Sequence, residues 1–527
     1  MLGKRDPQRG LFSSASCFAV DLDRLGFYGQ LARDGYRVFR DSDFASCYAE
    51  TGRPSAPPSQ LALARLLQHY EAISDDDVID RLRYDLRWKA ALDLDPLSIS
   101  APFVKATFQG FRVRLTLHAK EGLAFERSVR EAKKAGLLPK KLCSALDSSP
   151  VRGRGAIKDT FNLLSDAIRA VVRSLAVKNE REPEEEAARG GVERHFKAAS
   201  IKGSEPVDWN NQDEVGAFLG GLLKDCEAVA RAARKAKCAS DELALLEKVI
   251  DQDVDRSGDE PAIRDGVAKD RVVSITDPEM RHGHKSNGKV YNGHKAHIAV
   301  DTESGVITAI DVSSPSEPDG SKVASLIQQS EKLTGSIVAQ AVADCAYSSR
   351  EATAQAEAEG VDLMTKMPSP PPGRFGPADF KVSNDGETAR CPAGHLSARR
   401  SRAKETLVHH WSREVCDGCP LRDRCLTVNA RAKVPRRDGR SLSIMPDFQD
   451  RRRREKKARS KSGRALLKRR VAVEHAIGWI KNLGAGASRY FGRAKTKAHW
   501  LWAAAVVNLL RIAAAARRND ELGGAAA

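Results

Sequence analysis

The sequence predicts an α/β protein in which a helical N-terminal domain, a helical insertion and a Cys-rich insertion accompany a mixed β-sheet. Three observations support this fold class. Apolar residues recur at helical spacing in the first 141 residues and again over residues 156–270. From residue 271 the period becomes strand-like. Residues 337–343 then form an almost uninterrupted run of small apolar side chains, which is typical of a strand buried on both faces.

The size and charge of the chain limit its function. With 527 residues it is too long for one compact core and predicts three or four domains. Lys and Arg number 87 against 70 for Asp and Glu, and this net charge of +17 indicates a polyanionic partner, with nucleic acid the leading candidate. No secretory leader is recognised, so we expect a cytoplasmic, nucleoid-associated protein. The apolar run 500–516 contains Asn508 and Arg511, which favours a buried core helix over a membrane span.

Residues 1–141 are expected to form a helical N-terminal DNA-binding domain. Ser59, which follows two prolines, is the expected N-cap of one helix, and Ser74 precedes a second. A third helix near residues 103–118 carries Arg112 and Arg114, which we predict to contact DNA. Short helices with basic residues on the last favour a helix-turn-helix reader of DNA. The alternative is a helical docking or dimerisation module.

The central part of the chain predicts a sheet that is interrupted early. Residues 142–155 supply its first strand, and residues 156–270 look like a helical insertion. The sheet resumes over residues 271–366. Its expected strands are 271–275, 295–300, 306–312, 337–343 and 361–365, with helices over 321–333 and 350–359. Strands 295–300 and 306–312 are expected to pair as a hairpin, with Gly305 in the connection.

Residues 367–455 are predicted to be a Cys-rich insertion. Four cysteines follow the pattern C-x24-C-x2-C-x5-C, namely Cys391, Cys416, Cys419 and Cys425. This spacing predicts a structural Zn²⁺ site, in which His395 is able to replace one thiol. An iron–sulfur cluster and reduced structural cysteines are the alternatives. Ten cysteines in a chain of this length do not predict a disulfide scaffold.

Residues 456–517 are predicted to be basic C-terminal helices that complete the core, followed by a tail over 518–527. Between residues 451 and 470, 12 of 20 side chains are Lys or Arg. This density predicts binding to a phosphate backbone, because a solvated run of like charges repels itself unless something neutralises it. The predicted DNA contacts are Arg451, Arg452, Arg453, Arg454, Lys468 and Arg469.

The last part of this basic region carries a candidate catalytic stripe. In a helix over residues 465–482, Arg470, Glu474 and Lys481 fall within about 40° of one another around the axis. A Glu four residues after an Arg is ordinarily a surface ion pair. Here the stripe borders the apolar face that would pack on the sheet. This position favours a carboxylate that binds a metal ion beside a phosphate.

Two aspartates are placed where they can meet Glu474. Asp147 lies in the first strand, and Asp344 ends the strand 337–343, where open sheets present ligand-binding groups. Taken singly, each would be interpreted as a turn or cap residue. Together the three carboxylates offer the oxygen ligands that Mg²⁺ or Mn²⁺ prefers. They are sufficient to hold two ions about 3.5 to 4 Å apart, an arrangement suited to phosphodiester chemistry.

Several segments resemble the core of bacterial insertion-sequence transposases of the InsH-like kind. They are Asp277-Pro278-Glu279-Met280, residues 292–301, Ser304-Gly305 with Asp319, and residues 343–347. The stretch Asp147-Ser148-Ser149-Pro150 is similar to the family's first-aspartate strand, and Gly52-Arg53-Pro54 and Leu66-Leu67-Gln68 resemble the domain that precedes this core. The resemblance covers most of the chain. It implies a ribonuclease H-like mixed sheet that carries an Asp, Asp, Glu triad.

The final helix of that family carries Tyr, two residues, Arg, three residues, Glu, six residues and Lys. Arg470, Glu474 and Lys481 fit these intervals, and Leu467 stands where the Tyr is expected. The Cys-rich insertion resembles a feature of a related subgroup. The helical insertion departs from the family pattern, so Asp277 is retained as an alternative first carboxylate.

The resemblance implies a DNA transposase. In this interpretation Asp147, Asp344 and Glu474 hold two Mg²⁺ or Mn²⁺ ions, while Arg470 and Lys481 contact phosphate. The expected partners are double-stranded DNA of the terminal inverted repeats and of the target, bound by a homodimer, with no membrane partner. Two alternatives remain at this point: a metal-dependent nuclease that performs no strand transfer, and a non-catalytic DNA-binding protein from a degraded element.

Overall fold

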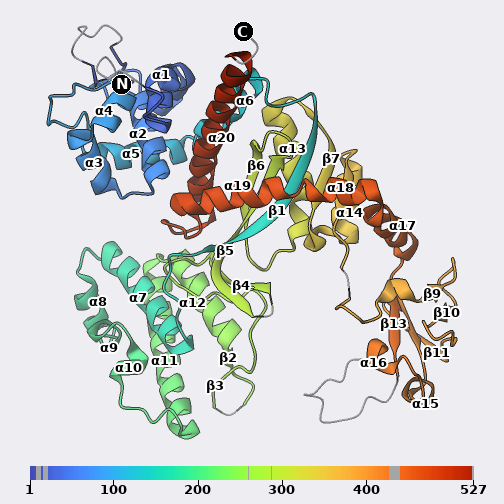
Figure 1. The fold of residues 1–527 in the computed structure, drawn as a ribbon. Helices are drawn as coiled ribbons and strands as arrows, with labels where there is room; N and C mark the ends of the chain where they lie inside the picture. Colours follow the sequence, from blue (N-terminus) through green and yellow to red (C-terminus); the bar gives the residue numbers. More distant parts are fainter. Residues whose placement is uncertain are drawn as a thin grey trace.

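The computed structural model describes residues 1–6, 14–15, 22–258, 260–286, 288–368, 370–426 and 439–524. Four parts are visible in Figure 1: an N-terminal group of helices, a central sheet with its covering helices, a helical lobe and a small β-rich lobe. The central sheet connects the other three parts. Its geometry therefore determines where the candidate site residues lie.

The central sheet has six strands in the order β4-β5-β1-β7-β8, with β6 paired to β5. β1 is antiparallel to β5 and parallel to β7, and β8 is parallel to β7. Five strands therefore run in the order β6-β5-β1-β7-β8, a mixed sheet consistent with the predicted ribonuclease H-like core. The strands are β1 Lys141–Arg152, β4 Arg281–Ser286, β5 Lys289–Asp301, β6 Ile307–Ser313, β7 Ile337–Ala343 and β8 Asp362–Thr365.

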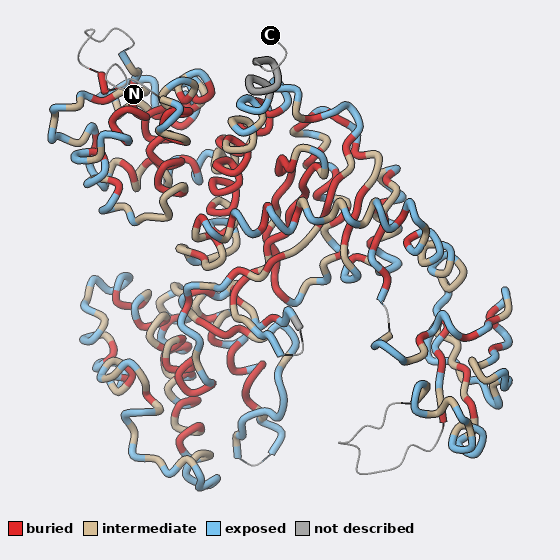
Figure 2. The backbone as a smooth tube through the Cα atoms, viewed as in Figure 1, coloured by how far each residue is buried: buried red, intermediate tan, exposed pale blue. Residues whose placement is uncertain are grey.

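Helices cover both faces of this sheet. Ala145 and Leu146 are neighbours on β1 and both are fully buried, and successive strand residues point to opposite faces. α13 packs on β5, β6 and β7, and α19 packs on β1 and β5. The elements that cover the sheet are α13 Val323–Thr334, α14 Arg350–Ala358, α18 Lys461–Lys468, α19 Val471–Ile480 and α20 Arg493–Gly524. Figure 2 shows buried residues in this sheet, in α20, in the N-terminal helices and in the helical lobe.

The apolar helix near the C-terminus is α20. Residues 493–518 are long and apolar enough to cross a membrane by length and composition alone, but 61% of the most apolar window is buried inside the protein. The helix packs against α2, α6 and β6. The preference for a core helix is therefore confirmed.

Asn508 explains the polar interruption of that helix. It is fully buried, its Oδ1 accepts a hydrogen bond from Ile307 N at 2.8 Å, and its Nδ2 donates to Ile307 O at 3.0 Å. The register between β5 and β6 shifts at this point. The side-chain amide of Asn508 therefore provides hydrogen-bond partners for the N–H and C=O of Ile307, which the irregular strand pair leaves without backbone partners.

The N-terminal block is helical, as predicted. The prediction of Ser59 as an N-cap is wrong: the helix begins at Pro58 with Pro57 at the cap position, and Ser59 N donates to Asp41 Oδ1 at 2.9 Å. Ser74 does cap the next helix, because its side chain accepts from Asp77 N. The elements are α1 Phe27–Val38, η2 Asp41–Cys47, α2 Pro58–Glu71, α3 Asp75–Tyr84, α4 Leu86–Leu92, α5 Lys105–Leu117 and α6 Leu123–Lys134.

These N-terminal helices share one hydrophobic core with the sheet. Buried residues of α1, α2 and α5 belong to the same cluster as those of β1, β7 and α20. The N-terminal block is therefore packed onto the sheet rather than tethered to it.

The insertion after β1 forms a helical lobe with a separate core. Its long helices bury residues such as Leu164, Leu222 and Leu246 against one another. The elements are α7 Thr160–Lys178, α8 Pro183–Arg189, α9 Arg194–Lys197, α10 Ile201–Ser204, α11 Gln212–Ala236 and α12 Ser240–Asp253, followed by β2 Val254–Asp255 and β3 Ala262–Ile263.

The strand predicted over residues 271–275 is wrong. Within the described residues this segment belongs to no strand. The side chain of Gln252 takes that place: its Oε1 accepts from Val272 N at 2.8 Å and its Nε2 donates to Val272 O at 3.0 Å. The first strand after the insertion is instead β4.

The helix predicted over residues 465–482 is divided into three pieces. α18 ends at Lys468, α19 begins at Val471, and a π-turn, η6 Lys481–Ala485, follows. Hydrogen bonds from Arg469 N to Leu466 O and from Arg470 N to Leu467 O tighten the chain into a turn between α18 and α19. This turn places Arg470 next to β1.

The Asn508 contacts yield a stability prediction. Replacing Asn508 with Ala leaves the N–H and C=O of Ile307 buried without their partners, so the free energy of unfolding should fall by about 1–3 kcal/mol. Urea denaturation followed by tryptophan fluorescence measures the change. Asn482 is exposed on the protein surface, and its replacement by Ala is the control, with an expected change within about 0.5 kcal/mol. Equal losses in the two variants would contradict the role of Asn508.

Candidate active site

The register between β1 and β7 brings two predicted carboxylates together. Leu146 pairs with Ala343 across the two parallel strands, so Asp147 and Asp344 are the next residues on neighbouring strands. Such strands lie about 4.8 Å apart. β1 continues to Arg152, whereas β7 ends at Ala343, and the Asp344 carboxylate caps a short turn by accepting from Ala346 N at 2.9 Å.

Arg470 connects the sheet to the third predicted carboxylate. Its Nη1 donates to Asp147 Oδ2 at 3.0 Å, and its Nη2 donates to Glu474 Oε1. Asp147 lies on β1, and Glu474 lies in the first turn of α19. One guanidinium therefore holds two carboxylates that the sequence separates by more than 300 residues.

The environment of Asp147 alters its titration. Its side chain is only 17% exposed. Burial raises the pKa of Asp147 to about 6, and the negative charge of Asp344 adds to this effect. The Ser148 N–H, which donates to Asp147 Oδ1 at 2.8 Å, and the positive charge of Arg470 act in the opposite direction. A carboxyl group with a raised pKa of this size is typical of a functional site.

Lys481 completes the predicted stripe at the end of α19. Burial lowers the pKa of the Lys481 ammonium, the like charge of Lys285 lowers it further, and Asp147 opposes both effects. Glu474 is more open, with 51% of its side chain exposed. The stripe therefore has a covered cationic end and an exposed carboxylate.

Asp319 is a fourth carboxylate in this cluster that we did not predict as a site residue. Its Oδ2 accepts from Ser148 Oγ at 2.9 Å, and its Oδ1 lies 2.8 Å from Lys295 Nζ. Within the sequence, Pro318-Asp319-Gly320 has the composition of a turn. The only available signal was its place among the segments that resemble the transposase family.

Tyr347 lies beneath the three aspartates. It is fully buried, and its hydroxyl has no hydrogen-bond partner within the described part of the protein. Burial raises the pKa of Tyr347, and the negative charges of Asp319, Asp147 and Asp344 raise it further. The phenol therefore stays protonated. Its O–H group donates to no acceptor within the described residues.

Asp277 and Leu467 lie outside this cluster. Asp277 is fully buried, its Oδ2 accepts from Gly492 N at 3.1 Å, and it lies 3.3 Å from His294 Nε2. It therefore holds the start of α20 against β5. Leu467 packs at the margin of the central core, where its side chain offers no polar contact.

The donor set of the cluster fits a divalent cation by its chemistry. Asp147, Asp344 and Glu474 offer carboxylate oxygens, the ligands that Mg²⁺ and Mn²⁺ prefer. Across the described ranges, no three His, Cys, Asp or Glu side chains are close enough to hold one ion together, and the Arg470 cation separates Asp147 from Glu474. A shared ion therefore requires the arginine side chain to move.

A basic surface lies beside this cluster on two helices. α17 Phe448–Arg459 and α18 carry the run of Lys and Arg. Several of these side chains already have partners within the protein. Arg454 donates to Thr353 and pairs with Asp447, Lys457 pairs with Asp362, and Arg469 pairs with Glu303. Five are exposed and have no carboxylate partner within the described residues, namely Arg451, Lys456, Lys461, Arg464 and Lys468. We call these five residues the basic surface.

The other predicted DNA contacts vary in exposure. Arg452 lies over the Phe448 ring, and Arg453 pairs with Asp450. In the N-terminal block, Arg112 pairs with Asp75 and is 20% exposed, whereas Arg114 lies over the Tyr48 ring. DNA contact by these residues stays a prediction. Arg112 and Arg454 have the least freedom to make such contacts.

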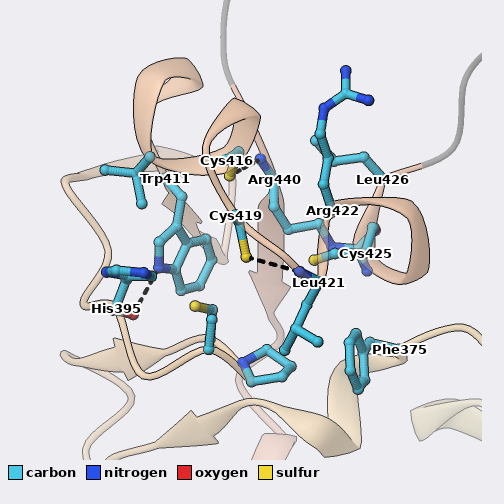
Figure 3. A pocket seen from close by; sticks show the side chains of 14 residues that line it. Phe375, His395, Trp411, Cys416, Cys419, Leu421, Arg422, Cys425, Leu426 and Arg440 are labelled. Atoms are coloured by element: carbon cyan, nitrogen blue, oxygen red, sulfur yellow. Dashed lines mark hydrogen bonds between the residues drawn. The ribbon is translucent and has the colours of Figure 1, made fainter.

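The four predicted thiol ligands converge in the β-rich lobe. Cys391, Cys416, Cys419 and Cys425 line a cavity of about 20 Å³ together with His395 and Trp411. Figure 3 shows the sulfurs of Cys416, Cys419 and Cys425 facing the same space. The lobe is remote in sequence from Asp147 and Asp344.

Comparison with protein families identifies two regions of the chain. The family described as "Transposase DDE domain" matches residues 261–509, and the family described as "Transposase domain (DUF772)" matches residues 30–114. Asp344 and Glu474 lie inside the first match, whereas Asp147 precedes it because the helical insertion separates β1 from the other strands. Neither a curated protein nor a solved structure matches the chain. Membership of the Cys-rich subgroup stays a prediction.

The pKa of Asp147 predicts how pH affects cation binding. A carboxyl with a pKa of about 6 loses its charge as pH falls through 6, so binding of Mn²⁺ should be about tenfold weaker at pH 5 than at pH 7. Electron paramagnetic resonance of free Mn²⁺ measures the affinity. In Asp147→Asn the affinity should be low, and its change between pH 5 and 7 should disappear. An unchanged affinity of the wild-type protein across this range would contradict a role for Asp147 in binding.

Proposed function

We propose that this chain, which carries a transposase DDE domain over residues 261–509 and a DUF772 transposase domain over residues 30–114, cuts DNA at the ends of an insertion sequence and joins those ends to target DNA. The observation that supports this activity most is the position of Arg470 between Asp147 and Glu474, beside Asp344. A sheet aspartate and a helix glutamate thereby occupy one charged cluster. A basic surface adjoins it.

We propose that Asp147, Asp344 and Glu474 are the metal ligands of this enzyme. Bound there, Mg²⁺ or Mn²⁺ would activate the attacking oxygen and stabilise the leaving oxygen of the phosphodiester. Asp319 does not contact the metal in this proposal. It holds Ser148, the neighbour of Asp147, and the charge of Lys295 compensates its own.

Arg470 and Lys481 are proposed to bind phosphate. Arg470 donates to negatively charged carboxylate oxygens of Asp147 and Glu474. The oxygens of a phosphodiester are also negatively charged acceptors, so a guanidinium is able to bind them in the same way. When the carboxylates turn toward cations, Arg470 is free to donate to the DNA. Burial lowers the pKa of the Lys481 ammonium, and an anion bound beside it would favour the charged form. Both residues then lie where negative charge develops during the reaction.

The basic surface is proposed to guide the duplex into the site. α18 ends at Lys468, two residues before Arg470, so phosphates that follow α17 and α18 lead directly to the reacting strand. Cutting two ends together favours a homodimer on paired terminal repeats. Sedimentation that finds a single protomer on paired ends would contradict the dimer.

The identity of the products separates transposition from plain nuclease activity. A Mg²⁺ reaction with a labelled terminal repeat and a supercoiled target plasmid should give DNA in which the 3′ end of the repeat is covalently joined to the plasmid. Cleavage without joined products would indicate a nuclease. Tight binding without cleavage would indicate a DNA-binding protein from a degraded element.

Glu474→Gln tests the catalytic proposal. The substitution preserves size and removes the charge needed to hold a cation, so the cleavage rate should fall at least about a thousandfold, or about 4 kcal/mol, while the affinity for DNA changes little. Cleavage of a labelled repeat and a gel-shift titration measure the two quantities.

The matched control for this experiment is Glu351→Gln, a change of an exposed Glu on α14. It should leave both quantities unchanged. Undiminished cleavage by Glu474→Gln would remove this residue from the mechanism.

A further inference from the structure

The cysteines of the β-rich lobe come from separate turns that close around one cavity. Cys391 follows β10 Ala389–Arg390, Cys416 lies in α15 Arg413–Asp417, and Cys425 ends α16 Arg422–Cys425, with Cys419 between the last two. Four further strands belong to the described part of the lobe, namely β9 Lys381–Val382, β11 Arg399–Ala403, β12 Thr406–His410 and β13 Ser441–Ile444. Segments that are far apart in the lobe thus each bring one cysteine to the same cavity.

Two of the sulfurs accept hydrogen bonds from backbone N–H groups. Arg440 N donates to Cys416 Sγ and Leu421 N donates to Cys419 Sγ, each at 3.4 Å, the second of which is drawn in Figure 3. Gly439 allows the first approach, because a Cβ at this position would lie 2.6 Å from Cys416 Sγ. Backbone N–H groups aimed at sulfur stabilise its negative form. Within the described residues none of these cysteines forms a disulfide.

The hydrophobic core of the lobe is too small to explain its folding. Its buried cluster contains only Phe380, Val382, Ala389, Trp411, Leu442 and Ile444. Cys391, Cys416 and Cys425 pack against that cluster, so the thiols occupy the place where a larger lobe would have core side chains. Small scaffolds with so little buried apolar area need a disulfide or a metal.

We propose that the lobe binds one Zn²⁺ ion through Cys391, Cys416, Cys419 and Cys425. The four cysteines that line this cavity would supply the all-thiolate ligand set that zinc prefers in structural sites. The cavity of about 20 Å³ accommodates a single small sphere, which favours one ion over a cluster of several iron and sulfide atoms. This site is independent of the carboxylate cluster and of the reaction proposed above.

His395 contributes through its backbone. Its carbonyl accepts from Cys391 N and from Trp411 Nε1, each at 2.9 Å. These bonds hold the turn that presents Cys391 to the cavity. Within the described residues the sulfurs line the cavity without the short spacing of a closed metal shell. We expect metal binding to draw them together by rotation of the cysteine side chains between staggered conformers.

Metal analysis of the full-length protein tests this site. Protein purified without added metal should contain about one zinc per chain and no iron by mass spectrometry, and Co²⁺ should replace the zinc and give the visible absorption of a tetrahedral thiolate site. Zinc should be almost completely lost from Cys419→Ser. It should be retained in Cys238→Ser, which alters a partly buried cysteine of the helical lobe.

A folding measurement distinguishes a metal site from a purely structural role of the thiols. Removing the metal from the wild-type protein with a chelator should expose the lobe to trypsin, and adding Zn²⁺ back should restore its protection. Stoichiometric iron, the absence of metal from the wild-type protein, or equal zinc loss from Cys238→Ser would each overturn the proposal. None of these measurements depends on DNA cleavage, so a failure here leaves the transposase proposal intact, and the reverse also holds.

Discussion

The ion pair that Arg470 forms with Asp147 and Glu474 is the contact on which the functional region depends. It joins residues 323 positions apart in the chain. Three aspartates lie close enough to influence one another, and burial makes their charges costly. Such a cluster is stable only if cations compensate it and a rigid backbone resists the repulsion. Arg470 and Lys295 supply the positive charge, and the paired strands β1 and β7 supply the rigidity.

The sheet also determines where the two insertions leave the core. β1, β7 and β8 are parallel, so their carboxyl ends meet at one edge of the sheet. The helical lobe follows β1, and the β-rich lobe follows β8. Both lobes lie below the sheet in Figure 1. Both lobes therefore leave the sheet at the edge where β7 presents Asp344.

Much of this arrangement could be predicted from the sequence because it depends on local patterns. The strand Ile337–Ala343 and the hairpin around Gly305 follow from apolar periodicity and turn chemistry. The segment 271–275 misled us because its pattern is strand-like while its hydrogen-bond partner is the side chain of Gln252. The sequence also did not predict that the expected helix over residues 465–482 is interrupted at Arg469 and Arg470, because Arg has a high propensity for helix interiors.

The cluster itself was only partly predictable. Asp147, Asp344 and Glu474 were selected by their positions on strands and on a helix stripe. Asp319 was not selected as a site residue, because its importance arises from contacts with Ser148 and Lys295 that bridge distant segments. The density of Lys and Arg in the sequence also suggested more side chains free to contact DNA than the structure has. Arg112 and Arg454 belong to patterns typical of DNA binding, yet tertiary contacts with Asp75 and Asp447 hold their guanidinium groups.

The single core shared by the N-terminal helices and the sheet has a mechanical consequence. Buried side chains of α1, α2 and α5 interlock with α20 and the strands, so the two regions cannot reorient separately without opening apolar surface to water. If the N-terminal block grips DNA, the separation between the gripped base pairs and the severed bond is set by the protein alone. The protein would then fix the number of base pairs between the DNA held by the N-terminal block and the bond that is cut, in addition to any recognition of sequence.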